Sequence, residues 1–141
     1  MLSSEPVYTI GIAVQKLDVS VHSLRQYEKE GLIIPFRTST GRRLYSDLEL
    51  EKVRCIKEMI QVEGLNFEGI RRIMAFIPCY NIRGCSKKVK NSCKAFKDKT
   101  LPCWASQEKC DCKLPSCRDC SVYQRFVHCD DIKPLIYEAE K

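Results

Sequence analysis

The cysteines of this chain are distributed unevenly, and this distribution limits what each half can fold into. Nine of the ten lie beyond residue 78, while Cys55 stands alone in the first half. A segment this rich in cysteine, with Lys, Ser and Asn throughout, buries too little apolar surface to fold on a hydrophobic core alone. The sequence therefore predicts residues 1–77 as a unit with an ordinary core, and residues 78–141 as a unit held together by its cysteines.

Composition indicates a cytoplasmic protein. The 44% hydrophobic content is enough for a packed core, but no run approaches the ~20 apolar residues of a transmembrane helix. The N-terminus lacks the basic region and the apolar stretch of a signal peptide. We therefore expect no membrane partner. In a reducing cytoplasm, dense cysteines more often indicate metal or redox chemistry than disulfides.

The net charge of +6 is also uneven, at +1 for residues 1–78 and +5 for residues 79–141. A basic protein favours nucleic acid as its partner. The alternative is that the lysines of the second half only offset cysteine thiolates. A DNA-binding prediction must therefore rest on where individual arginines lie.

The first half reads as two short helices joined by a tight turn. Thr9 caps a helix whose apolar residues share one face, namely Ile10, Ala13, Val14 and Leu17. Ser20 caps a second helix, in which Val21, Leu24 and Tyr27 face inward and His22, Arg25, Gln26 and Lys29 face outward. Gly31 ends this helix. This is the helix-turn-helix pattern.

A basic hairpin follows, then two more helices. Thr40-Gly41 predicts a turn, flanked by Arg37, Arg42 and Arg43. Ser46 and Glu49 form a capping box that opens a third helix, which ends at Gly64. Asn66 caps a fourth helix, and Pro78 stops it. Leu48, Cys55, Met59 and Val62 fall on one apolar stripe of the third helix. We therefore expect Cys55 to be a buried small apolar side chain rather than a ligand.

Residues 8–76 resemble the DNA-binding domain of the MerR family of bacterial regulators. The matching stretches are Tyr8–Gly11, Val19–Glu28, Gly31–Ile33, Gly41–Tyr45 and Gly64–Ile70. Gln26 departs from the pattern, because the family usually has a second tyrosine there. The resemblance implies a winged helix-turn-helix domain. With the cysteine-rich half, the sequence predicts a mainly α fold in which this domain is followed by a small, irregular, metal-stabilised cysteine-rich module.

The resemblance also implies roles for the matched residues. Arg25 and Tyr27 would contact DNA from the recognition helix, with His22 near base edges, while Arg43 and Tyr45 would hold the backbone at the wing. The alternatives are core packing for the two tyrosines and a solvated face for the arginines. The candidate DNA-binding residues are Ser20, His22, Arg25, Gln26, Tyr27, Arg37, Arg42, Arg43 and Tyr45.

The family resemblance implies a homodimer, yet the usual long dimerisation helix is missing. Pro78 and Cys79 stand where that helix would begin, and no useful heptad run follows. Only residues 131–140 show a further helical pattern, with Ile132, Leu135, Ile136 and Ala139 on one face. A helix this short needs a surface to dock on.

The cysteine-rich half contains an imperfect repeat that resembles the "two-CW" module attached to bacterial sensory proteins. Cys79-Tyr80 and Cys103-Trp104 open its two copies. The tightest cluster, Cys110, Cys112, Cys117 and Cys120, suits a zinc ion or an iron–sulfur cluster. A second or differently divided ligand set is Cys79, Cys85, Cys93, Cys103 and Cys129. The alternative is that zinc or disulfides only hold the module together.

These features predict a transcriptional regulator of MerR type, without enzymatic activity, that binds double-stranded promoter DNA. The cysteine-rich half would sense metal or redox state, and RNA polymerase would be a further partner. One alternative is a DNA-binding protein whose cysteine module is only structural. Another is a thiol redox or metal-trafficking protein, although the βαβ pattern that would accompany an exposed C-x2-C is not evident.

Overall fold

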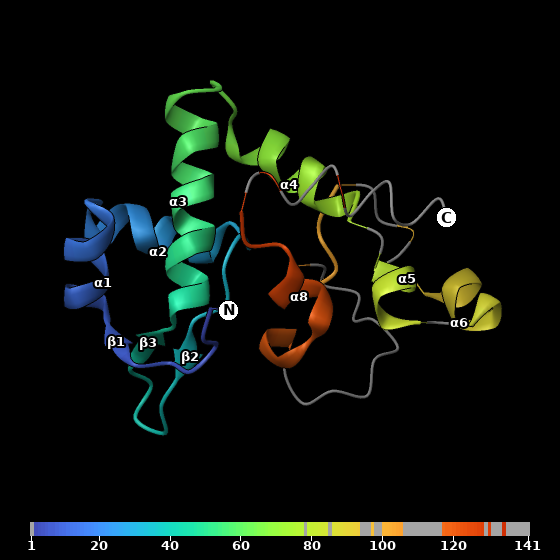
Figure 1. Ribbon diagram of the computed structural model, residues 1–141, viewed down its shortest axis with the longest axis horizontal. Coiled ribbons are helices and arrows are strands. Elements are labelled where there is room, and N and C mark those ends of the chain that lie inside the picture. Colours follow the sequence, from blue (N-terminus) through green and yellow to red (C-terminus); the bar gives the residue numbers. More distant parts are fainter. Residues whose placement is uncertain are drawn as a thin grey trace.

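The computed structural model describes residues 2–77, 79–84, 86–93, 97, 100–105, 117–128, 130 and 134. Helices predominate, with one small sheet, as in a winged helix-turn-helix. Figure 1 shows the N-terminal helices and the sheet on one side and the short helices α5 and α6 on the other, with α8 between them. Within the described residues, no helix is long and apolar enough to cross a membrane.

The helix-turn-helix forms where the capping residues predict it. Helix α1 covers Ile10–Leu17, and the side chain of Thr9 accepts a hydrogen bond from the backbone N–H of Ile12. Helix α2 covers Val21–Lys29 and is capped by Ser20. Asp18 takes a left-handed conformation with φ 53° at the turn between them. The buried residues Ala13, Leu17 and Leu24 join the two helices to the core, so the predicted inward faces are confirmed at these positions. The prediction is wrong for Val21, which is 39% exposed in the first turn of α2.

The predicted hairpin supplies two strands, one at the edge and one in the centre, of a three-stranded antiparallel sheet. Strands β1 (Tyr8–Thr9), β2 (Phe36–Arg37) and β3 (Arg43–Tyr45) lie in the order β1-β3-β2. The β2–β3 hairpin is called the wing below, and its tip projects at the bottom of Figure 1. Gly41 turns the chain at φ 84°, a conformation that side chains other than glycine rarely adopt.

Two further helices support the wing and close the core. Helix α3 covers Asp47–Gln61 and begins with the predicted capping box between Ser46 and Glu49. Helix α4 covers Phe67–Ala75 and is capped by Asn66. One prediction in this region is wrong, because Val62, placed on the apolar stripe of the third helix, is 77% exposed. The helix ends at Gln61, so the stripe ends one residue before Val62.

The described part of the cysteine-rich half consists of short helices. These are α5 (Cys79–Arg83), α6 (Lys87–Ser92), the 3-10 helix η1 (Cys117–Asp119) and α8 (Ser121–Arg125). Helix α5 stands where the family's long dimerisation helix would begin, and it has five residues. The helix predicted over residues 131–140 falls on positions of which only residue 134 is described.

One hydrophobic core draws residues from both halves of the chain. Val122 and Phe126 on and beside α8 belong to the same buried cluster as Val53 and Ile56 of α3. Val122, Phe126, Val53 and Ile56 are each no more than 1% exposed. The residues beyond 78 therefore bury apolar side chains against α3. The sequence predicted that this segment has too little apolar surface for a core of its own, and the core that it joins is that of the first half.

Tyr45 supplies a test of this core. Its hydroxyl is buried and has no hydrogen-bond partner within the described part of the chain, and leaving such a group unpaired costs about 1–3 kcal/mol. We expect Tyr45→Phe to leave the free energy of unfolding unchanged or to raise it by about 1 kcal/mol. A loss well above that size in urea titrations would show that the hydroxyl has a partner.

The same variant has a pH signature. Burial, with a smaller contribution from Glu28, raises the pKa of Tyr45 from 10.0 to about 12. The unfolded chain therefore releases this proton at lower pH than the folded chain, and stability falls as pH rises from 10.0 to about 12. We expect the free energy of unfolding of Tyr45→Phe, measured by urea titration, to fall less steeply over this alkaline range than that of the wild type.

Candidate nucleic-acid interface

Helix α2 presents a polar face to solvent. Ser20 uses its hydroxyl to accept a hydrogen bond from the backbone N–H of Ser23 (3.0 Å), so it fixes the start of the helix. His22 and Arg25 are exposed on the outer face, and Gln26 is half-buried beside them. Helix α2 thus has the form of a recognition helix, with a basic side chain directed outward.

The wing carries two arginines directly opposite each other. Arg37 and Arg43 are register partners on β2 and β3, and like charges in such positions repel. Glu28 of α2 lies between them, with one carboxylate oxygen 2.8 Å from Nη2 of Arg37 and the other 2.5 Å from Nε of Arg43. This arrangement holds both wing strands to the recognition helix. Sequence reasoning missed Glu28, because nothing in its local pattern distinguishes it from a solvated helix residue.

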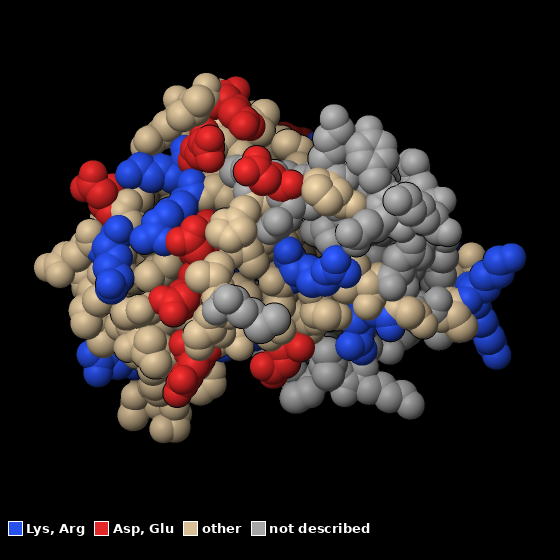
Figure 2. Space-filling model, in the orientation of Figure 1, with Lys and Arg blue, Asp and Glu red and all other residues tan. Residues whose placement is uncertain are grey.

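Three of the predicted basic or polar contacts remain available at this surface. His22, Arg25 and Arg42 are exposed, and none of them forms an ion pair with another described residue. On the face drawn in Figure 2, Lys and Arg are interspersed with Asp and Glu over α1 and α3 rather than gathered into one patch. Placement of individual arginines, and not bulk charge, therefore carries the DNA-binding prediction.

Two of the predicted contacts lie in the core instead. Tyr27 is 7% exposed and Tyr45 is 0% exposed. The ring of Tyr27 packs edge-to-face on Phe67 of α4, with centroids 6.0 Å apart. The expectation that these tyrosines face DNA is corrected to the alternative stated for them. Their apolar rings fill the space between α2, the wing and α4.

The described cysteines bring together residues from both predicted ligand sets. Cys79, Cys103, Cys117 and Cys120 carry thiols that are not in disulfides. Burial, with smaller contributions from the three neighbouring thiols, raises the pKa of Cys103 to about 12. Cys93, also a thiol, is buried at 5% exposure. Among the described residues, no three His, Cys, Asp or Glu side chains are arranged to hold a metal ion.

Four predicted ligands, Cys85, Cys110, Cys112 and Cys129, lie outside the described residues. Cys55 departs from its prediction in one respect. It is buried at 4% exposure as expected, but its sulfur is bonded in a disulfide. Cys55 belongs to the same buried core cluster as Cys120 and Phe126 of the second half.

Two charged side chains of α3 are buried where the second half covers them. Glu49 and Lys52 are each 0% exposed, and their spacing places them on one helix face. Arg118 pairs with the Glu49 carboxylate at 2.7 Å, and its own side chain is only 11% exposed. Tyr123 also donates its hydroxyl hydrogen to Glu49, at 3.2 Å. Burial next to this carboxylate raises the pKa of Tyr123 well above 10.0.

Lys52 lies in a cage of three aromatic rings from the second half. Its ammonium nitrogen is 3.9 Å from the ring centroid of Tyr123, 5.0 Å from that of Trp104 and 5.4 Å from that of Phe126. A cation held against ring faces is attracted to their negative quadrupole, the more so when water is excluded. Trp104 and Tyr123 also pack edge-to-face on each other. Tyr123, Trp104 and Phe126 thus pack around a residue of the first half.

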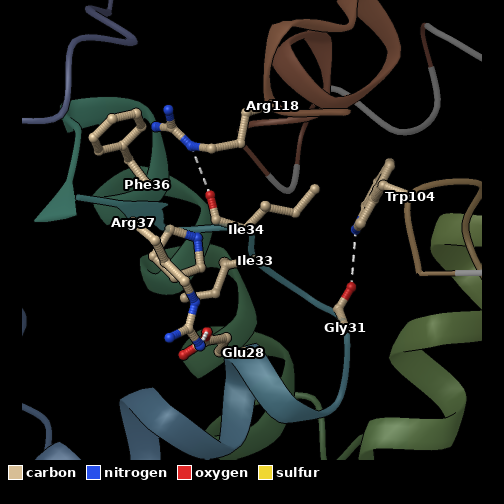
Figure 3. A pocket seen from close by; sticks show the side chains of 9 residues that line it. Glu28, Gly31, Ile33, Ile34, Phe36, Arg37, Trp104 and Arg118 are labelled. Carbon is tan, nitrogen blue, oxygen red and sulfur yellow. Dashed lines mark hydrogen bonds and ion pairs between the residues drawn. The ribbon is translucent and has the colours of Figure 1, made fainter. Parts of the chain in front are cut away.

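A hollow of about 510 Å³ lies where α2, the wing and the second half meet. Figure 3 shows Phe36 and Arg37 on one side of it and Trp104 on the other, with the Arg118 side chain extending toward Phe36. Residues 33–37, which connect α2 to the wing, form one of its walls. The segment entering the wing therefore borders this hollow, and its Ile34 side chain packs in an apolar cluster with Tyr123 and Val127 of the second half.

Comparison with known proteins agrees with this geometry for the first half. Residues 8–77 match the model of the family described as MerR HTH family regulatory protein. The chain is 41% identical over 69 residues to the "Putative heat shock protein HspR" of Streptomyces coelicolor, covering 49% of this chain and 46% of that protein.

Two further relatives are regulators by name. The HTH-type transcriptional regulator GlnR of Bacillus anthracis is 35% identical over 71 residues, which is 50% of this chain and 54% of GlnR. The HTH-type transcriptional regulator MlrA of Escherichia coli is 30% identical over 70 residues, covering 49% of this chain and 28% of MlrA. The chain thus spans about half the length of the first two relatives. The family match ends at residue 77, so the "two-CW" resemblance stays a prediction.

The role of Glu28 can be tested by stability. Glu28→Gln leaves Arg37 and Arg43 opposite each other with no carboxylate between them, and we expect it to lower the free energy of unfolding by about 1–2 kcal/mol. Glu68→Gln is the matched control, because Glu68 forms only an exposed pair with Arg72 at 3.7 Å. The control should cost under about 0.5 kcal/mol. Equal costs in chemical denaturation would contradict the role given to Glu28.

Proposed function

This chain belongs to the MerR HTH family through residues 8–77, and from this premise we propose that it is a transcriptional regulator that binds double-stranded promoter DNA. The observation that carries the proposal is the exposed Arg25 on α2 beside a wing that Glu28 holds to the same helix. A helix of this size fits the major groove, where side chains read base edges. The arginines of the wing, Arg42 above all, suit the phosphate backbone.

Binding through a helix and a wing favours regulation by DNA shape. The family resemblance implies that such proteins bind promoters whose elements are too far apart and untwist them, so that RNA polymerase can engage. The energy needed to untwist DNA depends on its sequence, so such a protein can discriminate between promoters at positions whose bases it does not contact. On this proposal two copies of the chain act together on one operator. The second half of each copy, in place of a long helix, supplies the contact between them.

Salt dependence of binding tests the interface. Removing an arginine that contacts a phosphate lowers the slope of log K against log salt concentration by about one unit. We expect Arg25→Ala to weaken binding and to reduce this slope, on a duplex selected by the wild-type chain from a random-sequence pool. Arg54→Ala is the control, because Arg54 lies on α3 and pairs there with Glu51. Unchanged affinity and slope for Arg25→Ala would remove α2 as the recognition helix.

We further propose that the cysteine-rich half responds to metal or redox state. The support is the gathering of Cys79, Cys103, Cys117 and Cys120 around one position, which their effect on the pKa of Cys103 reports. The thiol of Cys103, with its pKa near 12, stays protonated at neutral pH. The described thiols do not have the arrangement of a metal site, and the zinc or iron–sulfur ligand set proposed from sequence includes Cys110 and Cys112, outside the described residues.

Metal content of the purified protein tests this second proposal. We expect anaerobically purified chain to contain zinc or iron, seen by elemental analysis and, for an iron–sulfur cluster, by visible absorbance. The double variant Cys117→Ser, Cys120→Ser should lose that metal, while Cys93→Ser, at a buried thiol outside the cluster, should keep it. Wild-type protein that folds without metal and whose DNA affinity ignores thiol oxidants would leave the cysteine half with a structural role only.

A purely structural role is the second candidate, and the packing favours it independently. The aromatic cage around Lys52 and the Glu49–Arg118 pair hold the second half on α3. In that case thiol chemistry would affect only stability, and DNA affinity at constant folded fraction would not change.

A further inference from the structure

Side chains of the second half bond the backbone of the segment that joins α2 to the wing. The indole N–H of Trp104 donates to the carbonyl oxygen of Gly31 (2.9 Å). The backbone N–H of Ile34 donates to the hydroxyl oxygen of Tyr123 (2.9 Å), and Nε of Arg118 donates to the Ile34 carbonyl oxygen (2.8 Å). Figure 3 shows two of these bonds, from Arg118 and from Trp104.

Arg118 and Tyr123 are also connected, through Glu49, to the residue that follows the wing. Arg118 and Tyr123 both bond the carboxylate of Glu49, at 2.7 and 3.2 Å. Glu49 in turn accepts hydrogen bonds from the backbone N–H and the hydroxyl of Ser46, the residue directly after β3, at 3.0 and 2.7 Å. A continuous hydrogen-bonded path thus runs from Ile34, before β2, to Ser46, after β3.

We propose that Arg118 and Tyr123 form a clamp at the root of the wing, through which the cysteine-rich half sets the position of the wing relative to α2 for DNA binding. The clamp consists of Arg118, Tyr123, Glu49, Ile34 and Ser46. The inference rests on the proposed function for its DNA-binding part, since it names how the second half acts on that same interface. Arg118 and Tyr123 are positioning residues, because they act on DNA contacts made by other side chains.

The geometry gives the clamp a direct effect on affinity. The wing has only two and three residues in its strands, so its own hydrogen bonds do little to fix its direction. Glu28 ties its arginines to α2, and the clamp holds the chain just before β2 begins and just after β3 ends. A wing released at its root must be ordered again when it binds DNA, which lowers affinity, while the same arginines still contact phosphates in the complex.

The clamp also lies next to Cys117 and Cys120, two of the thiols that gather around Cys103. Arg118 is in η1, between Cys117 and Cys120, and Cys120 is a core residue at 7% exposure. A change in the position of η1 therefore moves the Arg118 guanidinium from Glu49 and Ile34. The route from the second half to DNA consequently runs through the bonds of Arg118 to Glu49 and Ile34.

Tyr123→Phe in the full chain tests the clamp. The phenylalanine keeps the ring that packs on Trp104 and Lys52 and removes only the hydroxyl that bonds Ile34 and Glu49. We expect hydrogen exchange at the Ile34 amide to accelerate about fivefold or more, since one hydrogen bond contributes about 1 kcal/mol. Affinity for the duplex selected on the wild-type chain should fall by a similar factor, with an unchanged salt slope, because no charge is removed.

Two further variants complete the experiment. Arg118→Lys keeps the charge near Glu49 but lacks the planar fork that donates to two acceptors at once, so it should weaken DNA binding without altering the salt slope. Ser92→Ala is the control, because it removes one hydroxyl hydrogen bond of similar length, to the backbone carbonyl of Lys88 (3.1 Å), in helix α6, which lies far from the wing (Figure 1). It should leave Ile34 exchange and DNA affinity as in the wild type.

Each outcome decides one part. Faster Ile34 exchange together with weaker binding at constant slope supports the clamp. Faster exchange with unchanged affinity overturns its positioning role, and unchanged exchange overturns the contact itself. A wild-type chain that selects no duplex contradicts the proposed function, and the exchange data then still decide whether the contact exists. A fall in salt slope for Tyr123→Phe would contradict an effect through ordering cost alone, because it would mean that phosphate contacts are missing from the complex.

Discussion

Burial of two charges on α3 is the constraint on which the rest of the structure depends. Glu49 and Lys52 lie on one helix face and are both fully buried, and buried charges are tolerated only when other groups compensate them. The compensation comes from the second half, as the Arg118 guanidinium and as the rings of Tyr123, Trp104 and Phe126. The position of the second half on α3 is thereby fixed by an ion pair and by cation–π contacts as well as by apolar packing.

This constraint changes the relation between the two halves. Removing one partner of a buried pair costs about 3–5 kcal/mol, because the other charge is left uncompensated. The second half therefore cannot lift from α3 without Glu49 and Lys52 becoming hydrated, and the bonds to Gly31 and Ile34 break with it. The wing, the capping box of α3 and the cysteine-rich half consequently form one mechanical unit, rather than a DNA-binding domain with an appended sensor.

Local signals in the sequence predicted the first half well. The caps at Thr9, Ser20, Ser46 and Asn66 and the turn at Gly41 depend on neighbouring residues alone, so they could be recognised from spacing. Contacts between residues far apart in the sequence could not be recognised in this way. Nothing local distinguishes Glu28 or Lys52 from solvated helix residues, and their burial depends on partners nine or more positions away. The disulfide at Cys55 was missed for the same reason.

Native-state hydrogen exchange along the full chain tests the central claim most directly, because it measures which segments open together. If the buried charges join the halves, amides of α3 and those of residues 117–127 should exchange with the same free energy of opening, and the Ile34 amide should follow them. Rapid exchange throughout residues 117–127, with α3 and Ile34 still protected, would contradict the account, since the second half would then open on its own.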